Sequence, residues 1–172
     1  MAVALVEVYN PLWPLWFEQL KKRLEAALDG VPCAIEHVGS TAVPGMFAKP
    51  IIDINIVIEA GGFPLIKDRL ATLGYAHNGD QGIPGREVFK IPDEQLKASL
   101  PAHHLYACEK GAQPLIEHLA YRDFMRTSPE WRKKLNAFKW ELCEKYDNDR
   151  LAYQDGKAAM VREITDLALG NG

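Results

Sequence analysis

Two polar side chains, Asp53 and Asn55, interrupt an otherwise apolar run at positions 51–58. Successive side chains of a β-strand point to opposite faces, so these two share one face and Ile52, Ile54 and Ile56 share the other. Burying polar groups costs free energy unless they are paired, bind a metal or line a cleft. The run therefore predicts a strand with an apolar core face and a polar face that carries a site.

A small-residue turn, Gly39-Ser40-Thr41, precedes this strand and follows another predicted strand at 33–38. Glycine lets a backbone approach closely, and the Ser40 hydroxyl can bond a phosphate oxygen. Successive N–H groups of such a turn can also form a concave anion site. An ordinary turn is the alternative, but its place ahead of the Asp53 strand favours phosphate binding.

The sequence E-H-V-G-S-T-A-V-P-G-M-F-A-K-P-I-I-D-I-N, at positions 36–55, resembles the signature of the GrpB family within the nucleotidyltransferase superfamily. The family pattern usually ends in a second aspartate, where this chain has Asn55. The resemblance implies an α/β (α+β) fold, with a nucleotidyltransferase-like mixed sheet flanked by helices. It also implies one domain over 1–172, with a sheet-containing core at about 1–111 and C-terminal helices at 112–172.

The resemblance implies Mg²⁺-assisted transfer of a nucleoside monophosphate to an acceptor, with Asp53 and Asn55 as metal ligands. Ser40 and Lys49 would hold the triphosphate, and His104 would complete the coordination or act as an acid–base group. Asn55 supplies an oxygen but no charge. A second hypothesis is therefore a catalytically degenerate domain that binds a nucleotide or phosphorylated metabolite, or serves as an accessory domain.

His104 lies on a predicted strand at 103–109, where Tyr106 and Cys108 share its face. The alternative is a hydrogen-bonded, partly buried histidine without a role in a site. The nucleotidyltransferase fold normally carries a third carboxylate on a neighbouring strand. No acid occupies the middle of this predicted strand, and the nearest acids, Glu87 and Glu109, lie near strand ends.

The remaining candidate substrate contacts are basic or aromatic. Tyr153 and Lys157 are four residues apart and share one face if the segment is helical. The ring could stack on a base and the ammonium could contact a phosphate, or both could join helix to sheet. The complete set of expected substrate-binding residues is Gly39, Ser40, Thr41, Lys49, Arg86, Lys139, Tyr153 and Lys157.

Other periodicities predict the surrounding elements. A helix is expected from Asn10-Pro11 to Asp29-Gly30 and another at 65–73, with strands at 75–78 and 86–91 and a loop or helical turn at 93–98. The apolar positions 1–10 predict a strand or packing arm. Three helices are expected after 112, the first with an apolar face of Ile116, Leu119, Ala120 and Phe124.

Composition narrows the function classes. The chain has 172 residues, of which 48% are hydrophobic and 25% charged, as expected for one compact domain. Its net charge of −3 gives no sign of nonspecific nucleic-acid binding. Three scattered cysteines form no metal pattern, and no signal peptide or membrane span is expected. These features predict a cytoplasmic protein. The family resemblance implies that its partner is a nucleotide or phosphorylated small molecule.

Overall fold

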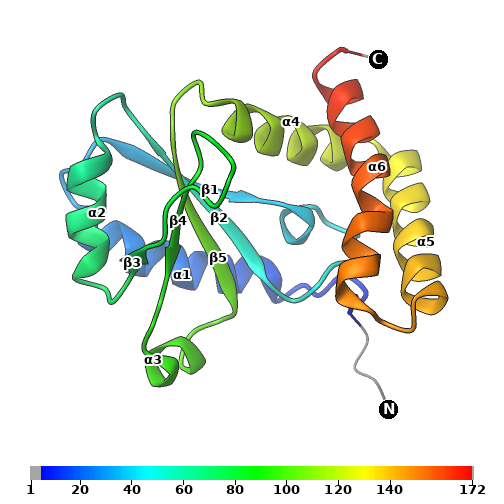
Figure 1. The fold of residues 1–172 in the computed structure, drawn as a ribbon, viewed down its shortest axis with the longest axis horizontal. Helices are drawn as coiled ribbons and strands as arrows, with labels where there is room; N and C mark the ends of the chain where they lie inside the picture. Colours follow the sequence, from blue (N-terminus) through cyan, green and yellow to red (C-terminus); the bar gives the residue numbers. More distant parts are fainter. Residues whose placement is uncertain (1–4, 172) are drawn as a thin grey trace.

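The computed structural model describes residues 5–171, which form a sheet with helices on both faces (Figure 1). The strands are β1 (Cys33–Val38), β2 (Ile52–Ile58), β3 (Ala76–His77), β4 (Glu87–Lys90) and β5 (His103–Glu109). The helices are α1 (Trp13–Ala27), α2 (Phe63–Ala71), α3 (Glu94–Ala98), α4 (Gln113–Thr127), α5 (Pro129–Lys145) and α6 (Arg150–Ala168). A short 3₁₀ helix, η1 (Ser40–Ala42), follows β1.

The five strands are ordered β1-β2-β5-β4-β3. β2 pairs antiparallel with β1 and parallel with β5, and the β5–β4 and β4–β3 pairs are antiparallel. The sheet is therefore mixed, as predicted. β2 and β5 are adjacent, which places Asp53 directly beside His104.

One face of the sheet packs on α1 and α2. Ile52, Ile54, Ile56 and Ile58 alternate along β2 and are all buried in this core. They contact apolar side chains of α1 and α2, including Trp13, Leu20, Leu24, Ile66 and Leu70. The predicted division of β2 into an apolar face and a polar face is therefore confirmed.

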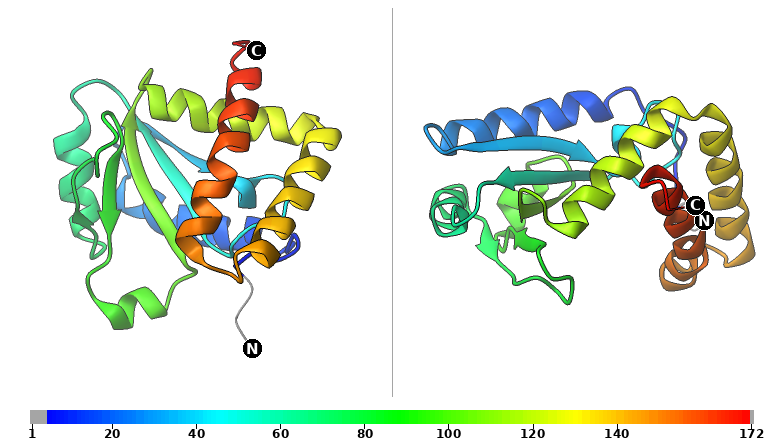
Figure 2. Two further views of the ribbon diagram at one scale, coloured as in Figure 1. Left: turned by 45° about the vertical axis from the view of Figure 1, so that its right-hand side comes forward. Right: turned by 90° about the horizontal axis from the view of Figure 1, so that it is seen from above.

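The polar face of the sheet is covered by α4, which lies on the side opposite α1 (Figure 2). α5 and α6 pack side by side at the end of the molecule away from α2 (Figure 1). Their contacts with the loop after η1 form two smaller apolar clusters, one around Met46 and one around Tyr153. These helices cover part of the polar face and leave the side chains of Asp53 and His104 partly exposed.

Two predicted elements differ from the structure. α1 begins at Trp13, because Asn10 uses its side-chain oxygen to accept a 2.9 Å bond from the Leu12 N–H, in a turn before the helix. The predicted apolar face of α4 is right only in part, because Phe124 packs against the cluster around Met46. Ile116 is 40% exposed, whereas Tyr121 and Met125 are buried against η1 and its loop.

The N-terminal prediction is only partly described. Positions 1–4 of the expected strand or arm lie outside the described residues, and Glu7 forms a single antiparallel bridge with Ala48. Within residues 5–171, no helix combines the length and the hydrophobicity that crossing a membrane requires.

Candidate functional site

Asp53 and His104 form the centre of the candidate site. They are direct neighbours in the parallel β2–β5 pair, and Nδ1 of His104 donates a 2.8 Å hydrogen bond to Oδ1 of Asp53. The His104 side chain is 48% exposed and that of Asp53 is 31% exposed. The pair therefore faces solvent, with the second imidazole nitrogen of His104 free of this contact.

Gly39 fits closely against Asp53. Its φ of 76° lies in the left-handed region, and a Cβ atom at this position would be 2.5 Å from Oδ2 of Asp53. Both facts require glycine, since a side chain would be strained and would displace the carboxylate. The turn that was predicted to hold phosphate thus lies directly against the predicted metal ligand.

Ser40 is held by two buried partners from the C-terminal helices. Lys139 Nζ donates a 2.9 Å bond to Ser40 Oγ and a 2.8 Å bond to the Phe47 carbonyl, and the Tyr121 hydroxyl lies 3.1 Å from the same Oγ. Burial, with help from nearby Lys157, holds the pKa of Lys139 well below its usual range. Burial also raises the pKa of Tyr121 to about 12.

Lys49 and Lys157 flank the ring of Tyr153. Their ammonium groups lie 5.4 Å and 5.2 Å from its centroid, within cation–π range. Burial lowers the pKa of both lysines; the Lys157 charge lowers that of Lys49 further, whereas Asp53 opposes the shift in both. Tyr153 is only 1% exposed, so its ring supports the lysines and is not open to stacking on a base. We call Lys49, Lys139 and Lys157 the lysine cluster.

Asn55 is fully buried. Its Nδ2 donates a 2.8 Å bond to Nδ1 of His118, and its Oδ1 accepts a 3.4 Å bond from the Cys108 thiol. The lowered pKa of His118, caused mainly by burial, agrees with a neutral ring that accepts at Nδ1. In this structure the Asn55 side chain joins β2 to α4 and β5 and presents no oxygen at the surface.

Two other predicted contacts lie outside the Asp53–His104 centre. Arg86 is stacked over the ring of Tyr106, 4.7 Å from its centroid, on the same sheet face as His104. Thr41 is 2% exposed, and its hydroxyl lies 2.9 Å from Nε2 of His37, whose ring stacks on Phe17 of α1. Consecutive residues of η1 thus contact different layers of the fold.

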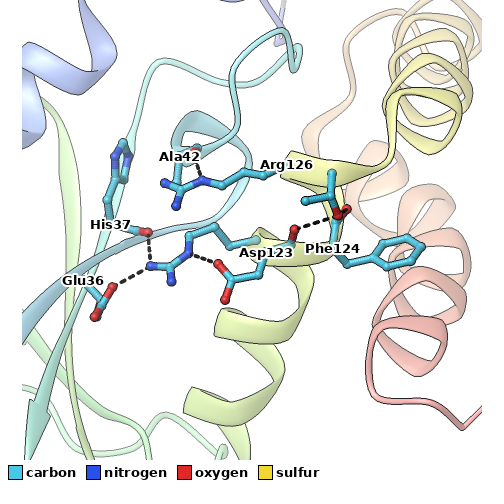
Figure 3. Close-up of polar contacts among 8 residues, drawn as sticks. Glu36, His37, Ala42, Asp123, Phe124 and Arg126 are labelled. Carbon is cyan, nitrogen blue, oxygen red and sulfur yellow. Dashed lines mark hydrogen bonds and ion pairs between the residues drawn. The ribbon is translucent and has the colours of Figure 1, made fainter.

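Sequence reasoning missed the polar side of α4. His118 and Tyr121 bond two predicted site residues, and Arg122 donates to Glu36 and to the His37 carbonyl over 2.6 Å and 3.1 Å (Figure 3). Glu36 therefore forms an ion pair with Arg122. A signal existed, because His118, Tyr121, Arg122 and Met125 recur at three- and four-residue intervals.

The described residues fit only part of the expected magnesium site. Mg²⁺ requires oxygen ligands and is often held by one or two carboxylates together with substrate phosphates. Of the two expected oxygen ligands, Asp53 has exposed surface and Asn55 has none. Among residues 5–171 no group of three or more histidine, cysteine or acidic side chains is arranged to hold a metal. Asp53 alone could thus share a metal with a bound phosphate, without a second carboxylate.

Known proteins are similar in sequence to this chain over most of its length. The family model described as GrpB protein matches residues 3–167. Glutamate-rich protein GrpB of Alkalihalophilus pseudofirmus is 34% identical over 168 residues, covering 93% of this chain and 92% of that protein. UPF0157 protein YqkA of Bacillus subtilis is 30% identical over 162 residues, covering 94% of this chain but 46% of that protein. The chain thus spans nearly all of one relative and about half of the other.

Solved structures share the fold. The crystal structure of conserved protein GrpB from Enterococcus faecalis has a TM-score of 0.80 at 29% identity and covers 96% of this chain and 97% of that chain. Cid1, in complex with its short product ApU, has a TM-score of 0.53 at 7% identity, over 81% of this chain and 45% of that chain. The second likeness concerns the fold alone and confirms that it is nucleotidyltransferase-like.

Proposed function

Because the chain belongs to the GrpB protein family, we propose that it binds a phosphorylated small molecule, specifically a nucleotide, beside Asp53. One observation carries this proposal. The lysine cluster gathers three ammonium groups, yet in residues 5–171 none of them has a carboxylate within 4.0 Å. Buried or half-buried ammonium groups without an acidic partner are costly, so each must either lose a proton more readily or gain an anion. A bound anion would restore their charge.

A phosphate group supplies the charge that the cluster lacks. Lys157 lowers the pKa of Lys49, and both lower the pKa of Lys139, so charged ammonium groups in this cluster repel each other. A bound phosphate would remove this repulsion and accept hydrogen bonds from the Lys49 and Lys157 ammonium groups. The Gly39-Ser40 turn, which lies against Asp53, adds backbone N–H groups to the same region.

A nucleotide is the favoured class of phosphate compound because of the fold. Cid1, which shares it, was solved with the dinucleotide product ApU. Mg²⁺ would enter with the phosphates and neutralise part of their charge, and the partly exposed Asp53 carboxylate would be its protein ligand. His104 is anchored through Nδ1, so its other ring nitrogen is available to a ligand hydroxyl or phosphate.

One feature favours a second function, transfer of the nucleotide to an acceptor. A histidine oriented by a carboxylate through Nδ1 can accept a proton at Nε2, as a general base for an acceptor hydroxyl. The Asp53–His104 pair has this arrangement. Binding remains the primary proposal, since Asn55 supplies no second accessible carboxylate.

Thermal melts with a matched set of ligands test the proposal. ATP, AMP and inorganic pyrophosphate, each with Mg²⁺ or EDTA, are compared with adenosine, which has no phosphate. We expect the phosphate compounds to raise the melting temperature, by an amount that grows with the logarithm of one plus the ratio of ligand concentration to Kd, and adenosine to have no effect. Lys157→Gln should weaken ATP binding roughly tenfold, as expected when one charge-assisted bond is lost.

Lys145→Gln is the matched control, because Lys145 also lies 5.2 Å from a tyrosine centroid, that of Tyr146, but outside the lysine cluster. It should leave the ATP response unchanged. An equal response to ATP in wild type and Lys157→Gln, or an equal response to adenosine and ATP, would refute the proposal. Release of pyrophosphate from ATP with Mg²⁺ and an acceptor would establish transfer instead.

A further inference from the structure

A pocket of about 500 Å³ opens between α1, the η1 turn and the junction of α4 and α5. Its charged side chains are Arg126, Arg132 and Glu18, and its rings are those of Tyr9, Phe17 and His37. Asp53, His104 and the lysine cluster do not line it. The pocket is therefore separate from the proposed nucleotide site, although Thr41, the neighbour of Ser40, forms part of its wall.

Both guanidinium groups are fixed by backbone carbonyls. Arg126 Nε donates a 2.9 Å bond to the Ala42 carbonyl, which Figure 3 shows near His37. Arg132 Nη1 donates to the carbonyls of Met125 and Arg126 over 2.6 Å and 2.9 Å. Across residues 5–171 neither arginine has a carboxylate within 4.0 Å. Two held guanidinium groups with unused N–H donors suit an oxyanion, which they can bind in a bidentate manner.

The rings supply an apolar wall beside these donors. Phe17 and His37 are stacked, with centroids 4.6 Å apart and planes at 13°. Thr41 holds the His37 ring through Nε2, and burial lowers the pKa of His37 to about 4, so the ring is uncharged at neutral pH. Flat neutral rings next to cationic donors match a ligand with a planar part and an anionic group.

We propose that this pocket is a second binding site, for a small organic oxyanion that carries a ring beside a phosphate or carboxylate group. Phenyl phosphate and benzoate are the probes, and benzylamine is the cationic control with the same ring. Backbone amide NMR shifts of Thr41 and Ala42 report occupancy. The two anions should give saturable shifts, the tighter one identifying the preferred head group, and benzylamine should give none.

Variants test the charges in both directions. Arg126→Gln and Arg132→Gln should each weaken the anion roughly tenfold, since each loses a charge-assisted contact. Glu18→Gln should tighten binding severalfold because it removes the acidic side chain of the pocket. Glu18 lies exposed on α1, so this variant remains informative if an arginine variant fails to fold.

Lys157→Gln separates this site from the proposed nucleotide site and should leave the Thr41 and Ala42 titration unchanged. Loss of those shifts in Lys157→Gln would show that the probes bind the lysine cluster, and would overturn the second site. Unsaturated shifts at about 10 mM probe, equal binding of benzylamine, or weaker binding by Glu18→Gln would overturn it as well.

Discussion

Lys139 and Ser40 are 99 residues apart in sequence, yet Nζ of Lys139 donates a 2.9 Å hydrogen bond to Oγ of Ser40. The lysine is 2% exposed and also bonds the Phe47 carbonyl. This contact joins α5 to the turn beside Asp53. The position of Ser40, the predicted phosphate-binding serine, therefore depends on the buried Lys139 of α5.

Removing that cation should change how stability depends on pH. The pKa of Lys139 is lower in the folded protein than in the unfolded chain, so the unfolded chain binds more protons below about pH 10. Stability should therefore rise as pH increases from about 7 to about 9. Lys139→Met should show a smaller rise in urea unfolding experiments, whereas Lys145→Met, at an exposed position, should keep the wild-type slope. Equal slopes in all three proteins would contradict a charge penalty at Lys139.

Gly39→Ala should disturb both the backbone and Asp53. The φ of 76° strains any side chain, and the new Cβ would lie 2.5 Å from Oδ2 of Asp53. We expect a loss of about 2–4 kcal/mol in the free energy of unfolding, from left-handed strain plus the clash. Gly45→Ala is the matched control, since its φ is 85° but no atom lies within 4 Å of the added Cβ. Denaturant unfolding of both variants measures the two losses in the free energy of unfolding. Equal losses would show that Asp53 moves away from the new Cβ at no cost in stability.

Asn55→Asp should destabilise the protein without creating a metal site. The new carboxylate would be fully buried beside His118 and would lose the Nδ2 donor, at a cost of roughly 1–3 kcal/mol. Melting temperatures with EDTA and with Mg²⁺ should show the same metal response as wild type. A larger Mg²⁺ response in the variant would mean that position 55 reaches the metal, and would support the transfer function.

Acid should destabilise the protein through His37. Its folded pKa of about 4 lies below the unfolded value of 6.5, so the unfolded chain takes up more protons between these values. Stability present above about pH 6.5 is lost as pH falls, by roughly 3 kcal/mol in total for this group. His37→Phe, which keeps a ring against Phe17, should lose less stability between about pH 7 and pH 5 in urea unfolding. A pH dependence identical to wild type would contradict this assignment.

The sheet could be predicted closely because its signals are local. β1 and β5 begin and end where expected, and the alternation of Ile52, Ile54 and Ile56 with Asp53 and Asn55 defined both faces of β2. Helix boundaries were less accurate, since Asn10 is typical of a helix cap but serves a preceding turn.

Hydrophobic periodicity alone does not predict the surroundings of the candidate site. His118, Tyr121 and Arg122 lie on the face of α4 that points toward the sheet and η1. Their hydrogen-bond partners are 63, 81 and 86 positions away in the sequence. Hydrophobic periodicity treats such residues as solvent-facing, so it identified Phe124 but missed the polar groups. The burial of Asn55 depends on the same distant partners and was missed for the same reason.

The order in which the chain is synthesised separates the two halves of the candidate site. One half contains the Asp53 carboxylate and its partner His104, which belong to adjacent strands and precede α4. Lys139, Tyr153 and Lys157 belong to α5 and α6 and leave the ribosome later. A nascent chain that ends before α5 therefore contains every strand of the sheet but only Lys49 of the lysine cluster, and the cationic half is completed only when α6 packs against the rest of the protein.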